Sequence, residues 1–362
     1  MLLGLALSAQ AAEPAQEARW GRLPRLYGRI TAQELGLVIN TADPYSVTIG
    51  EYYARRRGIP EANVLRVTLP LRNSLTREEF NALDETIRSQ MPEQVNGLAL
   101  AWVQPYAVDC NSLTSALGMG LQPGLCAHSC AVTRTSPYVS YFGARPWVVL
   151  GMRPAMQLAA RSVPAAMAMI ERGMASDHRL AAGAQEPAIA YLAATPDAAR
   201  NVRERLFPPA GPVPGVAGLD VARVSSKALP HMRRTLIYET GLARVPSPLG
   251  SEWLPGALAD HLTSLGGQLD NPAGHGQMNI LDWIDAGATA SYGTVSEPCN
   301  HVQKFPHPQV LIQAYAQGVS ALEAYWHSVA WPGQGAFVGE PLAAPFAPIA
   351  TPVAAPVAAP IP

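Results

Sequence analysis

The residues with the densest chemical potential form one short run, Glu297-Pro298-Cys299-Asn300-His301. This run follows a short apolar stretch and Gly293, at the kind of sheet edge where open α/β proteins bind ligands. A Cys299 thiolate with a neighbouring imidazole, from His261 or His301, would supply a nucleophile and its base. A disulfide through Cys299 is the competing interpretation and the favoured one if the chain is exported.

A second candidate pair, Asp260 and His261, lies in a segment whose leucines recur at helical spacing. This spacing predicts a helix over 256–265, stopped by the glycine pair that follows. At the border of the apolar face, His261 could act as a general base or as a metal ligand oriented by the carboxylate. A partly buried histidine bonded to the backbone is the simpler interpretation.

The two groups could also combine into a mixed nitrogen and oxygen ligand set. Asp260, His261, Glu297 and His301 are residue types that suit zinc. Ser264 could place a hydroxyl near a ligand at the end of the expected helix, but no G-x-S-x-G elbow surrounds it. We therefore expect binding roles for Asp260, Ser264, Glu297 and His301, and we assign no metal or other cofactor.

The four cysteines are Cys110, Cys126, Cys130 and Cys299. An even count in an oxidising compartment favours two disulfides, and four cysteines allow three pairings. The short spacing of Cys126 and Cys130 permits a small closed loop, which would leave Cys110 to pair with Cys299. The segment between Cys126 and Cys130 also holds a histidine, but one such cluster does not complete a tetrahedral metal site.

Short apolar strands alternate with helices along most of the chain, which is typical of a parallel sheet with helices on both faces. Capping boxes at Thr76–Glu79 and Ser320–Glu323 begin two of the helices. Strands are expected near 35–39, 64–67, 98–103, 188–192, 235–239 and 288–292. Helices are expected after Ser46, Thr76 and Ser320, over 163–172, 197–206 and 310–317, and around 280–286.

The remaining segments set the domain organisation. Residues 1–11 resemble the end of a secretory signal peptide, because a short apolar run precedes Ala9-Gln-Ala11. Residues 12–342 are expected to form a single α/β domain, in which 104–160 is a Gly-, Pro- and Cys-rich insert and 12–30 orders only by docking. Residues 343–362 are a Pro/Ala repeat that predicts an extended tail.

Composition excludes some classes of function. The chain has 362 residues, of which 48% are hydrophobic, and a net charge of −1, so it has no basic footprint for nucleic acid. No run after the signal is long and apolar enough to span a bilayer. The basic run Arg55–Arg57 is expected to be a solvated last turn of a helix.

Several blocks together resemble an uncharacterised bacterial family that occurs with the exosortase and PEP-CTERM protein-sorting system. The blocks are Asn40–Ser46, Tyr53–Pro60, Ser112–Gly120 and 255–342. The resemblance covers nearly the whole chain except the tail. It implies an exported protein, periplasmic or secreted, of the cell envelope or extracellular matrix.

A weaker likeness concerns the ending Phe337-Val-Gly-Glu-Pro-Leu342, which is similar to the Gly-Asp-Pro close of gingipain-type cysteine peptidases. That group implies a caspase-like α/β fold, in which a His-Gly pair ends one strand and a Cys ends the next. Here the strand near 235–239 runs into Thr240-Gly241, and the next segment gives Pro255-Gly256. Both catalytic positions are vacant in this alignment.

Two classes of function follow. The first is a non-catalytic, caspase-like binding or scaffold protein with an unknown protein or peptide partner in the cell envelope. The second is a hydrolase, peptidase-like, that uses Cys299 with His261, or a metal held by the Asp260/His261 and Glu297–His301 segments.

Overall fold

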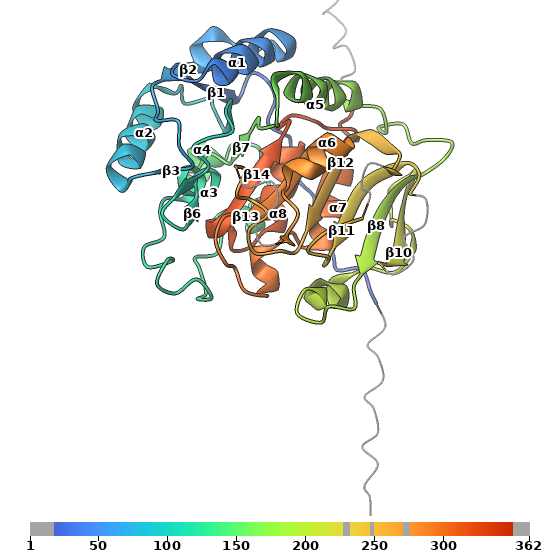
Figure 1. Cartoon of the computed structure of the whole chain (residues 1–362). Helices are drawn as coiled ribbons and strands as arrows, with labels where there is room; N and C mark the ends of the chain where they lie inside the picture. The colour runs from blue at the N-terminus through green and yellow to red at the C-terminus, as the bar shows by residue number, and fades with distance from the viewer. Residues whose placement is uncertain (1–17, 227–231, 247–249, 271–275, 350–362) are drawn as a thin grey trace, which may run out of the picture.

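The computed structural model of the protein describes residues 18–226, 232–246, 250–270 and 276–349 (Figure 1). Its strands are β1 (Leu35–Asn40), β2 (Val64–Val67), β3 (Ser74–Leu75), β4 (Gly97–Leu100), β5 (Ala107–Val108), β6 (Asn111–Ser112), β7 (Ala155–Gln157), β8 (Ala188–Ala194), β9 (Gly211–Pro212), β10 (Leu219–Ser225), β11 (Thr235–Thr240), β12 (Trp253–His261), β13 (Ala290–Thr294) and β14 (Gly335–Gly339). Its α-helices are α1 (Pro44–Arg57), α2 (Arg77–Gln90), α3 (Leu113–Met119), α4 (Pro146–Leu150), α5 (Val163–Ser176), α6 (Leu281–Ala286), α7 (Pro308–Ala316) and α8 (Ala321–Ser328).

Eleven described strands form one sheet in the order β2-β1-β4-β7-β14-β13-β12-β11-β8-β10-β9. Neighbouring strands run parallel except at two pairs, β13–β14 and β9–β10. The sheet therefore consists of two parallel half-sheets that run in opposite directions and meet where β13 pairs with β14. The sequence prediction of a mostly parallel α/β sheet is confirmed.

Helices cover both faces of the sheet, as expected. Alternation along β12 points Asp260 and His261 to opposite faces. On the His261 side, Trp283 of α6 packs against the imidazole. On the Asp260 side, Tyr292 lies beside Asp260 in register and stacks on Tyr325 of α8. The ends of β12 and β13 are thus fixed between two helical layers.

Local capping signals decide where several helices begin. The side chains of Thr76 and Ser320 accept hydrogen bonds from the backbone of Glu79 and Glu323, so both predicted capping boxes are confirmed. The prediction that Ser46 caps the first helix is wrong. Asp43 caps α1, while the buried Ser46 hydroxyl accepts from the backbone N–H of Asn40.

The segment predicted as a helix over 256–265 is instead the strand β12 with the turn that follows it. Its residues from Gly256 onward are buried, because β12 lies inside the sheet between β11 and β13. A strand covered on both faces carries apolar residues without alternation, so its leucines can fall at helical spacing by coincidence. The expected helix over 197–206 is also shorter, a 3₁₀ helix at Asn201–Leu206.

The predicted insert at 104–160 contributes to the large sheet through β7, which pairs with β4 and β14. Its earlier part supplies two strands of a small second sheet, β3-β5-β6. Within the described ranges, no helix combines the length and the hydrophobicity that crossing a bilayer requires.

Both ends of the described chain pack against the sheet's helices. Residues 18–26 lie along α7, where Gln309, Gln313 and Gln317 bond to their backbone. At the other end, residues 343–347 are buried and residues 348–349 are exposed, so the first residues of the predicted tail pack against the fold. The predicted signal peptide and the rest of the tail lie outside the described residues.

The basic run at the end of α1 is only partly solvated, which corrects one expectation. Arg55 is exposed, but Arg57 is only partly exposed and forms a two-pronged pair with the buried Glu340 at 2.6 and 3.0 Å. Arg57 also contacts Asp177, and Tyr53 donates to Glu340 at 2.6 Å. This cluster ties α1 to the end of β14.

Candidate functional site

The end of β12 carries His261, which is buried in the core. Trp283 Nε1 donates to its Nδ1 at 2.9 Å, so its Nε2 carries the proton and donates to the Met278 carbonyl at 2.8 Å. Burial lowers the pKa of His261 to about 4, which keeps the ring neutral. Both ring nitrogens are occupied, so the structure favours the simpler interpretation of a structural histidine.

Asp260 points to the other face, where it shares one buried cation with a second carboxyl. Arg203 lies 2.7 Å from Asp260 Oδ1 and 3.7 Å from Glu239 Oε1, and it donates to the Thr240 carbonyl at 2.9 Å. Burial raises the pKa of Asp260 to about 6, and burial and the Asp260 charge raise that of Glu239 well above its usual range. Burial therefore favours the protonated form of Glu239, and the ion pair of Arg203 with Asp260 is a structural element beneath the edge of the sheet.

The cysteines form two disulfides, as expected, but with a different pairing. Cys110 pairs with Cys126, and Cys130 pairs with Cys299. The predicted Cys126–Cys130 loop is wrong, because turns within 124–131 separate the two cysteines and direct each toward another segment. No described cysteine is free, so Cys299 has no thiolate to offer.

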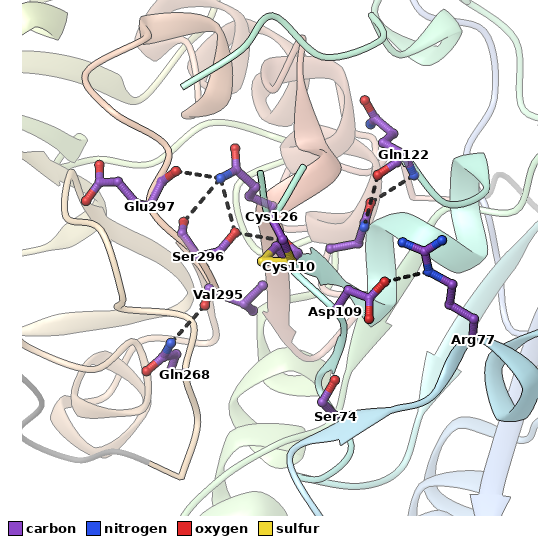
Figure 2. Close-up of a disulfide and its surroundings, with 12 residues drawn as sticks. Ser74, Arg77, Asp109, Cys110, Gln122, Cys126, Gln268, Val295, Ser296 and Glu297 are labelled. Atoms are coloured by element: carbon purple, nitrogen blue, oxygen red, sulfur yellow. Dashed lines mark hydrogen bonds and ion pairs between the residues drawn. A yellow bond between two sulfur atoms is a disulfide. The ribbon is translucent and has the colours of Figure 1, made fainter. Parts of the chain in front are cut away.

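The Cys130–Cys299 disulfide attaches the loop around 120–131 to the loop that follows β13, and the Cys110–Cys126 disulfide attaches the same loop to the turn between β5 and β6. Figure 2 shows Ser296 and Glu297 beside the Cys110–Cys126 disulfide. The Ser296 hydroxyl donates to the Cys110 carbonyl at 2.7 Å (Figure 2). Gln334 donates to the Glu297 carbonyl at 2.6 Å. The loop after β13 is therefore held at several points.

The other predicted site residues of this loop have local partners. Exposed Glu297 accepts from the backbone N–H of Cys299 at 2.7 Å. The His301 Nε2 lies 2.8 Å from the Cys130 carbonyl, and its ring packs against Trp331. Among the described residues, no three His, Cys, Asp or Glu side chains gather in a way that could hold a metal ion. The zinc hypothesis is therefore not supported by the geometry.

An open cleft of about 380 Å³ lies where β12 and β13 end. It is walled by the turn after β12, the disulfide-tied loop after β13 and the segment after β8. The residues that line it are Ala199, Arg200, Leu262, Thr263, Ser264, Glu297, Pro298, Cys299, Asn300 and Phe305. Three predicted site residues, Ser264, Glu297 and Cys299, thus share one cleft, whereas Asp260, His261 and His301 do not line it.

The turn after β12 is fixed against β13. The hydroxyl of Thr294 donates to the carbonyls of Thr263 and Ser264 at 3.0 and 2.9 Å, and the N–H of Gly267 donates to the Thr294 carbonyl at 2.9 Å. Gly267 comes so close to Gly293 that an added Cβ would lie 2.6 Å from the Gly293 carbonyl oxygen. The glycine pair that suggested a helix stop in fact allows two backbones to touch.

Thr263 is the most informative residue of the cleft. Its side chain is 2% exposed, and its hydroxyl has no hydrogen-bond partner among the described residues. Leaving a buried hydroxyl unpaired costs about 1–3 kcal/mol, so a ligand that bonds to it recovers that cost. Native proteins keep such groups rarely, and often at functional sites.

Charged groups stand on two sides of the cleft. Arg200 is half-buried and pairs with Asp197 at 2.5 Å, and exposed Glu297 lies in the opposite loop. With Ser264 and Asn300, the cleft offers hydroxyls, an amide, a guanidinium and a carboxylate. This set can form hydrogen bonds to a polar chain, but it contains neither a free thiol nor a hydroxyl bonded to a base.

Sequence reasoning missed Arg200 as a site residue and assigned no binding role to Thr263. Arg200 lies in a turn of the segment that follows β8, at the same sheet edge, so its position after an apolar strand was the available signal. Thr263 was masked by the helix prediction, which placed it in a final turn rather than just past a strand.

Comparison with known proteins adds no relative: no family model matches the chain, and no curated protein matches it.

Proposed function

We propose that the protein is an exported, caspase-like-fold binding or scaffold protein of the cell envelope or matrix, linked to the exosortase sorting system. Its cleft takes an extended segment of a protein or peptide partner and performs no chemistry on it. Thr263 carries the proposal, because it lines that cleft and its buried hydroxyl has no partner among the described residues.

The topology supports a caspase-like sheet. Five consecutive parallel strands, β10, β8, β11, β12 and β13, are followed by the antiparallel β14. The likeness to gingipain-type peptidases implies a His-Gly pair after one strand and a Cys after the next. Here β11 ends in Thr240-Gly241, and its neighbour β12 runs past Pro255-Gly256 to His261-Leu262. The corrected strand end also lacks a thiol, which favours binding over cysteine catalysis.

The cleft chemistry fits an extended peptide. A polypeptide backbone presents alternating N–H and C=O groups, and the lining hydroxyls of Thr263 and Ser264 can both donate and accept. Arg200 and Glu297 can meet charged side chains on either side. Export is supported by the two disulfides, which persist in oxidising compartments.

Binding can be tested with a fluorescent library of heptapeptides and the full chain. Thr263→Val keeps the shape of the side chain but removes the hydroxyl, so we expect binding of selected peptides to weaken about fivefold to tenfold. Thr48→Val removes an exposed hydroxyl on α1 and serves as the matched control. Equal affinities of the two variants would contradict the assignment of the cleft.

The hydrolase alternative predicts different results in the same preparation. We expect no titratable thiol in the unreduced, denatured chain and no cleavage of labelled casein. Cleavage by the native protein that Ser264→Ala abolishes would identify a hydrolase and overturn the proposal. If free thiol were present and cleavage were lost in both Cys299→Ala and His261→Ala, Cys299 and His261 would be the nucleophile and its base.

A further inference from the structure

Two segments that are distant in sequence run side by side on the surface, 18–30 and 141–150. The backbone N–H of Tyr27 donates to the Phe142 carbonyl at 2.7 Å. Gly28, with φ at +79°, comes so near that an added Cβ would lie 2.9 Å from the Cβ of Ala144. Tyr27 therefore lies within a few residues of the short helix α4.

These segments expose large apolar side chains together. Tyr27 is 65% exposed, and Val148 and Val149 of α4 are 47% and 62% exposed. Trp147 beside them is half-buried. Single exposed apolar residues are ordinary, but several of them on adjoining segments mark an interaction surface. We call Tyr27, Trp147, Val148 and Val149 the apolar patch.

Arginines lie in the same two segments as the apolar patch. Residues 18–30 contain four arginines and 141–150 contain Arg145, and neither segment contains an aspartate or glutamate. Among the described residues, no carboxylate lies within ion-pair distance of exposed Arg22, Arg25 or Arg145. Since the whole chain has a net charge of −1, this is a local concentration of charge.

The apolar patch is presented by a fixed backbone. The backbone N–H of Trp147 donates to Asn96 Oδ1 at 3.2 Å. The guanidinium of the buried Arg153 lies 3.7 Å from the centroid of the Trp147 ring. The Arg25 guanidinium lies 5.7 Å from the Tyr27 ring centroid. The glutamines of α7 hold the segment before Tyr27. The apolar side chains therefore project from a surface that is already ordered.

We propose that this patch binds the surface of an anionic lipid bilayer. Tryptophan and tyrosine favour the bilayer interface, aliphatic side chains enter the acyl boundary, and neighbouring arginines attract anionic headgroups. The positive charge of the two segments favours an anionic bilayer over a second copy of this chain. A second copy of this chain would bring the same arginines against each other, because a two-fold interface is built from the same surface twice.

The test uses full-length protein and vesicles of phosphatidylcholine with or without phosphatidylglycerol. We expect sedimentation only with the anionic vesicles, weakened by salt. Val148→Ser with Val149→Ser should reduce binding at least about tenfold, and Arg25→Gln or Arg145→Gln about fivefold each. Val132→Ser and Arg55→Gln change equally exposed residues elsewhere and should leave binding unchanged.

Hydrogen exchange shows which residues contact the vesicles. It therefore distinguishes binding by the apolar patch from binding by residues 1–17, which are the same in all variants. We expect anionic vesicles to slow exchange in 18–30 and 141–150. Binding without protection there, or equal loss in the control variants, would overturn the proposal. A dimer in sedimentation velocity that Val148→Ser with Val149→Ser dissociates would assign the surface to a second copy instead. Peptide binding at the cleft should be unaffected by all of these variants.

Discussion

His261 shows how burial changes the role of a residue that looks catalytic in the sequence. Its neighbour Asp260 does not orient it, because the two side chains leave β12 on opposite faces. Instead, Trp283 and the Met278 carbonyl fix the ring. A neutral, fully bonded imidazole of this kind stabilises the fold, and its contribution depends on pH.

The pKa of His261 is about 4 in the folded protein and near 6.5 in an unfolded chain. Its contribution to stability is therefore complete above pH 6.5 and is lost as pH falls toward 4. At about 1.4 kcal/mol for each pH unit, wild-type should lose about 3 kcal/mol more than His261→Gln on going from pH 7.5 to 4.5. Urea unfolding at the two pH values measures this difference.

His128→Gln is the control, because His128 is exposed. Its unfolding free energy should follow that of wild-type at both pH values. If His261→Gln also followed wild-type, the histidine would not be held neutral in the core.

At the scale of elements, signals that act within a few residues were predictable and long-range ones were not. The capping box at Thr76–Glu79 is complete within one turn, so the sequence is enough to place the start of α2. The fate of Leu258 depends on β11 and β13 on either side, which local spacing does not reveal. The cleft hydroxyl of Thr263 was assigned no binding role for the same reason.

The disulfide pairing depends on how loops from different parts of the fold approach each other. Spacing alone favoured a small loop between Cys126 and Cys130, whereas the fold brings Cys130 to Cys299 across 169 positions. Cys110 and Cys126 are separated by only 16. Since these separations differ greatly, the two disulfides should differ in the unfolded-state entropy that they remove.

Loop-closure entropy gives about 5 kcal/mol for the longer loop and about 3 kcal/mol for the shorter one. Cys130→Ala with Cys299→Ala should therefore destabilise the protein by about 2 kcal/mol more than Cys110→Ala with Cys126→Ala. Denaturant unfolding of the two double variants provides the comparison, each with the other disulfide intact. The reverse order would show that local packing, rather than loop length, sets the contribution of each disulfide.

At the scale of the molecule, the two half-sheets share one core. Buried apolar residues from strands of both halves belong to a single continuous cluster. The ion pair of Arg57 with the buried Glu340 adds a link between α1 and the end of β14. One domain over 12–342 stays a prediction, and the shared core of the described residues is the reason to expect it.

We therefore expect one cooperative thermal transition, with circular dichroism and tryptophan fluorescence giving the same midpoint. Glu340→Gln leaves Arg57 without its buried partner and should lower the free energy of unfolding by about 3–5 kcal/mol. The midpoint temperature should fall by the same amount for both probes. Glu51→Gln removes the exposed partner of Arg55 and should change little. Two separate transitions, with only one shifted by Glu340→Gln, would mean that the halves are separate domains.

The position of β14 in the chain has a consequence for biosynthesis. It pairs with β7 on one side and β13 on the other, yet it spans Gly335–Gly339, close to the carboxyl terminus. A ribosome delivers it after the other ten described strands of the sheet, so the edges of β7 and β13 stay unpaired until β14 has been synthesised. Open edges of this kind invite pairing with other chains. The nascent protein therefore depends on protection of those edges until its last strand arrives.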